Sequence, residues 1–553
     1  MNRHERRATA RESKKAKSPV IARSNRKEAD DLCSLGIALE QQGRHHEAFK
    51  AFDRAVQLSP GHADFWARRA DALANLNRPA DSLSSYERAL KLDPRHGDAA
   101  YGCGLLLLKL RRLDEAVSCF NLSDELQPDQ ARVLEHRAMA LHDLRRFEEA
   151  LADGQRAHAL NPVNADVCNT IGASLSKLSR DEEALPWFDR ALALRPDFIT
   201  ALINKAASLA QMLRIDEALT IYEQLETIDP NNADAEHNLG LVNLLTGNFG
   251  PGWTGREARW KTRIRPFFYP NFSQPMWRGD ADIAGKTILA YMDEGFGDTI
   301  QFARYVPMLS TRGARAILVV HDALYPLLST LPGVSQCLPK SIPSLPAFDL
   351  HCPISTLPLA FGTRLNTIPS AIPYLPRPAE ARRRAWADRL QSHLGACGKL
   401  RVGLAWSGNP TQANDHNRSM PLRMLLDLLN ADATFISLQK DPRPEDKILL
   451  GRAGILDLTS GLTDFAETAA LVSCLDLVIT VDTSVAHLAG ALGRPTWILL
   501  TFAADWRWLL GRDDCPWYPT VRLFRQKEKR SWADVVARVR SELTTRISLF
   551  GSQ

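Results

Sequence analysis

Long apolar segments are missing from this chain of 553 residues, of which 45% are hydrophobic and 24% charged. No run approaches the roughly 20 apolar residues of a membrane-spanning helix, so we expect no transmembrane segment. The nine cysteines are odd in number and never form a C-x-x-C pair. This spacing argues against a disulfide framework or a zinc site, and it favours a reducing compartment. We therefore expect a cytoplasmic protein without a metal.

An apolar core is also missing from residues 1–28, which carry ten Lys or Arg residues against Glu5, Glu12 and Glu28. A basic segment without a hydrophobic stretch is not a secretory signal. We interpret it as a disordered basic tail. Contact with nucleic acid or an anionic membrane surface is the alternative, but a solvated tail needs fewer assumptions, and no nucleic-acid partner is expected.

A repeat of 34 residues begins at residue 29. Each period has two positions for small residues, one for an aromatic residue and one for proline. This pattern is typical of paired antiparallel helices: the small residues let the helices approach, the aromatic ring fills the gap, and proline ends the second helix. The prolines are Pro60, Pro94, Pro128, Pro162, Pro196 and Pro230.

The length and pattern of this repeat resemble the tetratricopeptide repeat. Six full repeats cover residues 29–230, and a seventh first helix follows around Gly240. The predicted array spans residues 29–250 and should fold alone. The resemblance implies a protein or peptide bound in the groove of the array; a purely structural or dimerising array is the alternative.

Residues 251–284 are rich in aromatic residues, arginine, proline and glycine, and the repeat stops there. We interpret this segment as a connector that packs against both neighbouring domains. A strip for stacking nucleic-acid bases is the alternative. Its aromatic residues include Trp253, Trp260, Phe267, Phe268 and Trp277.

A first α/β lobe is predicted over residues 285–385. The predicted strand Lys286–Tyr291 runs into a turn flanked by Gly295 and Gly297, and Asp298 then opens a helix that begins at Thr299. Asp298 thus follows the carboxyl end of a strand, where α/β folds bind ligands. Capping the helix is its alternative role. Further strands are predicted at residues 316–321 and 348–351.

A second α/β lobe with a C-terminal helix is predicted over residues 386–553. Its strand at residues 402–406 leads into a polar loop that carries Arg418 and Ser419. The next strand, at residues 434–438, ends at Gln439 and Lys440.

The most informative stretch of this lobe is LVITVDTSVAHLAGALGRPTWILL, residues 477–500. A buried strand leads into Asp482, Thr483 and Ser484, which favour the start of a helix. Backbone N–H groups and the helix dipole at such a turn attract phosphate. Thr483 and His487 are four residues apart, so both can donate hydrogen bonds to a diphosphate. A capped helix with an ordinary histidine is the alternative.

The segments GFGDTIQFARYVPML, VGLAWSGNP, NRSMPL and VDTSVAHLAGALGRPTW resemble family 9 glycosyltransferases, the bacterial heptosyltransferase family, over about residues 285–545. The resemblance implies a two-lobed GT-B fold, a nucleotide-diphosphate sugar as donor, and inversion without a metal or another cofactor. It implies that Asp298 is the general base. It also implies that Arg418 and His487 add positive charge at the donor. The donor-binding residues would be Arg418, Ser419, Gln439, Lys440, Asp482, Thr483, Ser484 and His487.

We therefore predict a multidomain protein in which an all-α tetratricopeptide solenoid precedes an α/β, GT-B-like pair of Rossmann-type lobes. The predicted function is glycosyl transfer from a nucleotide sugar to a protein or glycan acceptor that the array presents. A protein-binding scaffold with a degenerate transferase lobe is one alternative, favoured by a first lobe of only about 100 residues. An enzyme like the protein O-linked N-acetylglucosamine transferases is the other, favoured by the order of the domains.

Overall fold

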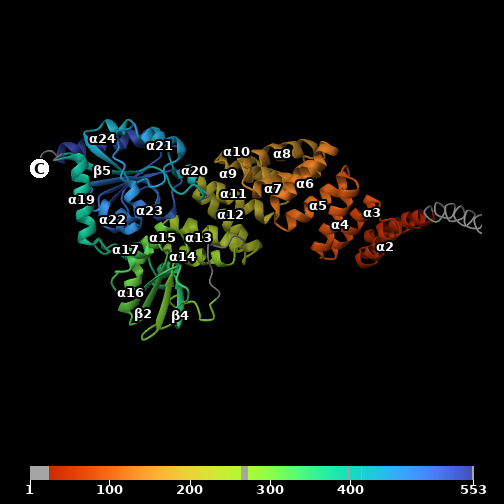
Figure 1. Cartoon of the computed structure of the whole chain (residues 1–553), viewed down its shortest axis with the longest axis horizontal. Coiled ribbons are helices and arrows are strands. Elements are labelled where there is room, and N and C mark those ends of the chain that lie inside the picture. Colours follow the sequence, from red (N-terminus) through yellow and green to blue (C-terminus); the bar gives the residue numbers. More distant parts are fainter. Residues whose placement is uncertain (1–23, 263–271, 396–397, 413, 551–553) are drawn as a thin grey trace, which may run out of the picture. The chain divides into compact units, whose positions relative to one another are not determined.

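The computed structural model describes residues 24–262, 272–395, 398–412 and 414–550 (Figure 1). The chain divides into two compact units, residues 1–212 and residues 213–553. Most of the expected basic tail lies outside the described residues, but residues 24–28 are helical rather than disordered. Within the described ranges, no helix combines the length and apolar character needed to cross a membrane.

The first unit is a series of antiparallel helix pairs, as the repeat predicts. Small and aromatic positions meet as expected: a Cβ atom at Gly104 would lie 2.6 Å from the Phe120 ring. Gly154 replaces the aromatic residue in one repeat, and Ile171 fills the space against it. After a helix over residues 24–41, the helices are α2 (His45–Leu58), α3 (Ala63–Asn75), α4 (Pro79–Leu92), α5 (Gly97–Lys109), α6 (Leu113–Leu126), α7 (Ala131–Asp143), α8 (Phe147–Leu160), α9 (Ala165–Lys177), α10 (Asp181–Leu194) and α11 (Ile199–Gln211).

The second unit begins with three helices that continue the helical pattern: α12 (Ile215–Ile228), α13 (Ala233–Leu245) and α14 (Phe249–Arg256). A Cβ atom at Gly255 of α14 would lie 2.9 Å from the Cα atom of Gly240 of α13, so these helices pack with their backbones close together. The seventh repeat is therefore a complete pair. The expected boundary at residue 250 is wrong, because it cuts α14, and the border between the units falls after Met212.

The first α/β lobe contains a parallel sheet of four strands in the order β3-β2-β1-β4. Strand β3 was not expected, since its side chains alternate poorly between buried and exposed positions. The strands are β1 (Thr287–Tyr291), β2 (Arg315–Val320), β3 (Val334–Pro339) and β4 (Leu350–Pro353). The helices of this lobe are α15 (Phe296–Phe302), α16 (Val306–Thr311), α17 (Tyr325–Leu328) and α18 (Leu357–Ala360).

The second lobe contains a parallel sheet of five strands in the order β6-β5-β7-β8-β9. Helix α19 packs into this lobe through Trp386 and Leu390, so the expected lobe boundary at residue 386 lies inside one of its helices. The strands are β5 (Leu400–Ala405), β6 (Ala433–Ser437), β7 (Leu477–Val481), β8 (Thr496–Leu500) and β9 (Val521–Arg525). The helices are α19 (Glu380–Leu394), α20 (Asp415–Arg418), α21 (Pro444–Leu450), α22 (Phe465–Val472), α23 (Ser484–Ala491) and α24 (Trp532–Phe550).

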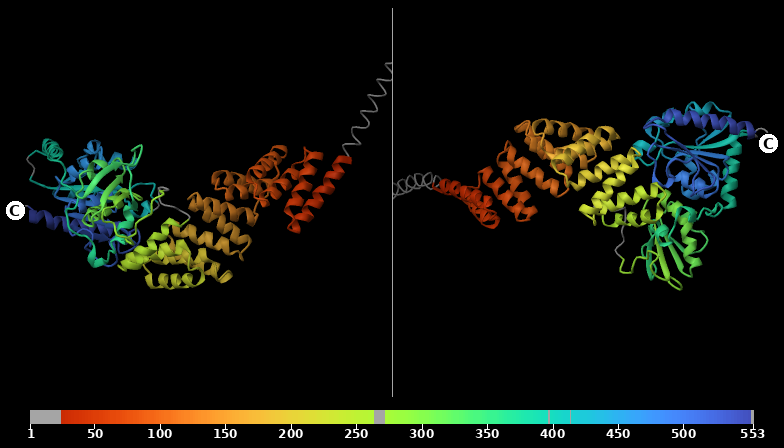
Figure 2. Two further views of the ribbon diagram at one scale, coloured as in Figure 1. Left: turned by 90° about the horizontal axis from the view of Figure 1, so that it is seen from below. Right: turned by 180° about the vertical axis from the view of Figure 1, so that it is seen from behind.

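Helices α13 and α14 lie against both lobes of the second unit, as the views of Figure 2 show. Trp253 of α14 is buried, and its ring centroid lies 5.2 Å from that of Trp506 and 6.4 Å from that of Phe302. Its indole N–H donates to the carbonyl oxygen of Thr363 at 3.0 Å. Expected as part of a connector, Trp253 therefore belongs to the core of the unit. Phe267 and Phe268 lie outside the described residues.

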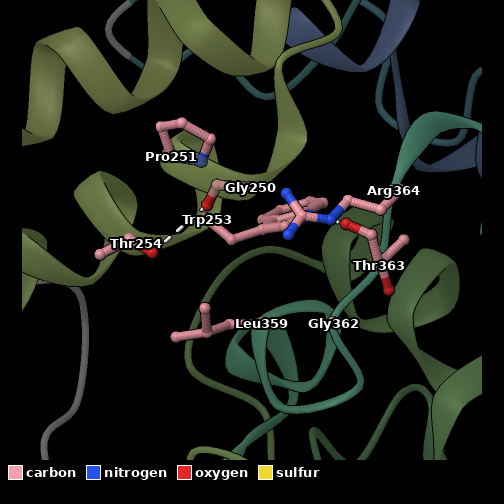
Figure 3. A pocket seen from close by; sticks show the side chains of 8 residues that line it. All are labelled: Gly250, Pro251, Trp253, Thr254, Leu359, Gly362, Thr363 and Arg364. Carbon is pink, nitrogen blue, oxygen red and sulfur yellow. Dashed lines mark hydrogen bonds between the residues drawn. The ribbon is translucent and has the colours of Figure 1, made fainter.

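A cavity of about 290 Å³ lies between α14 and the segment that follows α18 (Figure 3). Arg364 reaches across it so closely that a Cβ atom at Gly250 would lie 1.7 Å from its Nη1 atom. Only glycine fits at that position without a shift of the arginine. The glycine at the start of α14 thus lets Arg364 of the first lobe pack directly against the helix backbone.

Candidate active site

Each sheet has one place where the strand order reverses, and α/β sheets bind ligands beyond the carboxyl ends of the strands at such places. In the first lobe this place lies between β1 and β4, and in the second between β5 and β7. The expected site residues Asp298, Arg418 and Asp482 follow β1, β5 and β7. The fold therefore carries them to these two edges.

Arg418 and Asp482 meet at the edge of the second sheet. The Nη1 atom of Arg418 donates to the backbone oxygen of Asp482 at 3.0 Å, which joins the loop after β5 to the turn after β7. Ser419 braces the same loop, because its hydroxyl donates to Asp415 and accepts from the N–H of Gly408, each at 2.8 Å. Of the expected donor residues, these three are thus held together.

Gln439 and Lys440 have separate surroundings. The Oε1 atom of Gln439 accepts from the N–H groups of Trp406 and Ser407 at 3.1 and 3.0 Å, so this side chain fixes the end of β5. Lys440 is exposed and lines a cavity of about 430 Å³ together with Lys447. The described contacts do not join either residue to the turn after β7.

The turn after β7 starts a helix as expected. Thr483 is the N-cap of α23, and its hydroxyl oxygen accepts from the N–H of Val485 at 3.3 Å. Ser484 is the first helical residue. Burial and the nearby carboxylate of Asp505 raise the pKa of Asp482 to about 6. The turn therefore joins a helix N-terminus to a carboxyl group that titrates near neutrality.

His487 lies inside the protein with only 5% of its surface exposed. Its Nδ1 atom is hydrogen-bonded to the Tyr518 hydroxyl at 2.9 Å, and its ring stacks on Trp508 with centroids 5.4 Å apart. Burial and nearby arginines, Arg507 first among them, hold the pKa of His487 well below its ordinary value. This shift disfavours the protonated ring, which argues against the expected positive charge of His487 at the donor.

Asp298 lies within α15, which begins at Phe296 and not at Thr299 as expected. One carboxylate oxygen accepts from the N–H of Gly295, the N-cap residue, at 2.9 Å. The other oxygen accepts from the Arg507 guanidinium. Burial raises the pKa of Asp298, and Arg507 opposes this shift. Gly297 is the second residue of α15; a Cβ atom there would lie 2.7 Å from Cδ2 of His487, so α15 and α23 are in contact.

Arg507 is a site residue that the sequence reading missed. It follows β8 and is 8% exposed. Its Nε atom donates to Oε1 of Gln301 at 2.7 Å, and its Nη1 atom donates to Asp505 at 2.8 Å. The available signal was its place beyond the carboxyl end of a strand, in the polar and aromatic segment ADWRW.

A second missed group joins α14 and the residues after it to the end of β1. Arg256 donates to both carboxylate oxygens of Glu294 at 2.5 Å. Arg259 donates to the hydroxyls of Ser355 and Thr356 at 3.0 and 2.8 Å. Although burial alone would raise it, the pKa of Glu294 is held below its ordinary value by these two guanidinium groups. Helix α14 and the residues directly after it thus contribute cations to the edge of the first sheet.

Comparisons with known proteins agree with this architecture. Residues 34–72 and 67–131 match models of the tetratricopeptide repeat, and residues 456–505 match the model of glycosyltransferase family 9 (heptosyltransferase). The expected combination of tetratricopeptide repeats with a family 9 glycosyltransferase-like region is confirmed. The family 9 match at residues 456–505 includes Asp482, Thr483, Ser484 and His487, whereas Asp298 and Arg418 lie outside it.

Among curated proteins, Protein FlbA of Caulobacter vibrioides is 28% identical over 328 residues, which cover 54% of this chain and 53% of FlbA. The chain therefore spans about half the length of this relative. Among solved structures, the tetratricopeptide protein YrrB, described as having an unusual peptide-binding site, is 24% identical with a TM-score of 0.32 and covers 34% of this chain and 98% of its own. The pilF protein of Pseudomonas aeruginosa is 19% identical with a TM-score of 0.35, over 39% of this chain and 98% of its own.

Proposed function

We propose that this chain is a bacterial, cytoplasmic glycosyltransferase that moves a sugar from a nucleotide-diphosphate donor to an acceptor, with inversion and without a metal. The observation that carries the proposal is the bond between Arg418 and the backbone of Asp482. It places a guanidinium beside the N-terminus of α23, at the reversal point of the second sheet and within reach of the segment that matches family 9.

A departing diphosphate needs positive charge, which the chain itself can supply. Arg418 and Arg507 are arginines, whose planar guanidinium groups suit phosphate oxygens. The dipole of α23 adds partial positive charge at Ser484. Donors of this kind stabilise charge that develops on the leaving group.

An acceptor hydroxyl needs a base, and we assign this role to Asp298. Its carboxylate lies at the reversal point of the first sheet and faces the second lobe through Arg507. Burial raises its pKa, which increases the affinity of the carboxylate for a proton.

We further propose that the array binds and presents the acceptor, which is a protein or a glycan. The first unit has a cavity of about 620 Å³ whose walls mix acidic, basic and aromatic side chains. Tyr86 donates to Asp71 at 2.5 Å within it. Such a surface suits a polar peptide segment. The lining includes Asp64, Arg68, Asp71, Tyr86, His96, Asp98, Tyr101 and Arg132.

A binding scaffold is the second candidate function. It is favoured by one observation, the contact of Arg507 with Asp298, because a carboxylate that is paired with a guanidinium is a weaker base. In this case the second lobe would still hold a nucleotide or a sugar.

The test begins with thermal shifts of the full chain against a panel of nucleotide sugars, followed by product formation with the donors that bind. The side-chain amide oxygen of Asn can still accept from the N–H of the N-cap residue Gly295, so Asp298→Asn should keep the fold. Transfer should fall by roughly 10²–10⁴-fold if Asp298 is the base, while donor binding persists. Asp514→Asn is the matched control, since Asp514 pairs with Arg512 at the surface.

Two outcomes contradict the proposal in different ways. Unchanged turnover in Asp298→Asn would remove the base assignment but leave the enzyme. Donor binding by the unmodified chain without turnover on any acceptor would favour the scaffold.

A further inference from the structure

Residues 505–508 touch both halves of the proposed site. Arg507 binds Asp298 of α15, and its neighbour Trp508 stacks on His487 of α23. Arg507 and Asp505 also shift the pKa of Asp482 in opposite directions, so their charges act at the turn after β7. This segment therefore connects the carboxylate of the first lobe with the phosphate turn of the second.

Each carboxylate oxygen of Asp298 accepts a hydrogen bond. The Gly295 N–H holds one, and Arg507 holds the other. A substrate hydroxyl must approach a carboxylate oxygen directly to give up its proton, and the Arg507 guanidinium lies against one of the two oxygens. The Gly295 N–H belongs to the backbone at the start of α15 and is fixed by the fold, whereas Arg507 ends a long side chain. The arginine is the partner that can leave.

Gln301 gives a second, independent observation. Its side chain is completely buried, and its Oε1 atom accepts from Arg507. Its Nε2 atom has no hydrogen-bond partner among the described residues. A buried N–H without an acceptor costs free energy, and an anionic oxygen beside Arg507 would satisfy it. The surroundings of Arg507 thus suit an anion.

We propose that Arg507 binds the donor diphosphate, and that Asp298 and the diphosphate compete for its guanidinium, so that donor binding frees Asp298 to act as the base. This inference rests on the proposed function. A diphosphate has more negative charge and more acceptor oxygens than one carboxylate, and guanidinium pairs well with phosphate. Asp505 remains with Arg507 in either position, because both lie on the same segment.

The competition predicts how two substitutions combine. Calorimetry on the full chain would measure the affinity of ADP, GDP and UDP, and the tightest binder would serve as the probe. Asp298→Asn should tighten binding by roughly threefold to tenfold, since the neutral amide holds Arg507 less strongly. Arg507→Gln should weaken binding by roughly tenfold to 100-fold. In the double variant, Asp298→Asn should change affinity by less than about twofold, because no guanidinium is left to compete for.

Controls separate this coupling from damage to the fold. Asp514→Asn makes the same chemical change in a surface pair and should leave the affinity as it is. If Arg507→Gln does not fold, Arg507→Lys keeps the charge but not the planar donor group, and the gain from Asp298→Asn should shrink in that background. Melting temperatures of all variants show which are folded.

The inference is overturned if Asp298→Asn leaves nucleotide affinity unchanged, or if the same gain appears without Arg507. In either case nucleotide binding itself would still support the proposed function. Failure of every nucleoside diphosphate to bind the unmodified chain would instead contradict the proposed donor, and the competition with it.

Discussion

The N-cap arginines of the helix pairs and three buried arginines of the second unit differ in the partners that they bind. In the helix pairs, an arginine at the N-cap of each second helix pairs with a carboxylate three residues later, on the surface. In the second unit, Arg256, Arg259 and Arg507 are buried, and each binds at least one group that is 34 to 209 residues away. The surface pairs are Arg44–Glu47, Arg78–Asp81, Arg112–Glu115, Arg146–Glu149, Arg180–Glu183 and Arg214–Glu217.

The surface pair at the N-cap is lost in the seventh helix pair, α13 and α14. At the same N-cap position α14 has Asn248, and Pro251 takes the place of the acidic residue. Its arginine, Arg256, lies instead at the end of α14 and inside the unit. Surface pairs at this spacing contribute only a few tenths of a kcal/mol, whereas a buried charge must keep its partner. The same residue type therefore marks a repeat in one region and a site in the other.

The largest effect should come from separating α12–α14 from the lobes. A fragment of residues 213–553 should fold, whereas residues 257–553 should not. The shorter fragment loses Trp253, which packs against Trp506 and Phe302, and leaves Glu294 without Arg256. Circular dichroism and thermal melts of both fragments test this. A cooperative melt of residues 257–553 would mean that the last helix pair is dispensable, and the sharp contrast between the two regions would be lost.

The next effect compares one buried with one exposed pair. Arg256→Gln removes both close hydrogen bonds to Glu294 and leaves it only Arg259 and Arg507, each at 3.9 Å, so it should destabilise residues 213–553 by about 3–5 kcal/mol. Arg146→Gln, in the array, should change the stability of residues 24–212 by less than about 0.5 kcal/mol. Urea unfolding of the two fragments measures both. Similar losses from the two substitutions would contradict the comparison.

Donor binding should respond less. Arg418→Gln removes the guanidinium beside Asp482 and should weaken nucleotide-sugar binding by about 1–3 kcal/mol, the range for a hydrogen bond to a charged group. Arg423→Gln, an exposed position in the next segment, is the control. Calorimetry that shows equal affinity for the two variants would remove Arg418 from the donor site.

Local signals explain what could be predicted from the sequence. Strand β7 was predicted with its observed ends, because its apolar run, helix-start residues and glycine after the helix all lie within one stretch. The helix pairs of the array were predicted from the 34-residue period of the repeat. Helix α14 was missed because its glycines and proline read as a loop; Gly252 and Gly255 serve the close approach to α13 instead. Strand β9 was also missed, although the apolar residues Val521 and Leu523 alternate with the exposed Arg522 in its sequence.

The site was only partly predictable. Asp298, Arg418 and Asp482 lie where the ends of strands place them, and this rule needs only the order of strands and loops. The pairing of Arg507 with Asp298 spans 209 residues, and no spacing in the sequence indicates it. The low pKa of His487 follows from its burial and from nearby arginines, and Trp508 and Tyr518 contact its ring from another segment. Burial, which decides the charge, follows from the tertiary fold alone.

The smallest effect should be a dependence of donor affinity on pH. Burial and Asp505 raise the pKa of Asp482 to about 6, so its carboxyl group is neutral below this pH and anionic above it. The diphosphate of a nucleotide sugar keeps its charge between pH 5 and 8. An anionic Asp482 repels it, so affinity should fall as the pH rises through 6, by about 1 kcal/mol for charges at close range in a wet site.

Asp482→Asn should bind with the same affinity at both ends of the range, and Asp514→Asn should follow the unmodified chain. Calorimetry at pH 5 and 8 with one nucleotide sugar measures the slope. An equal slope in Asp482→Asn, or an affinity that rises with pH, would show that the carboxylate does not face the diphosphate. The buried arginines alone would then set the charge of the donor site.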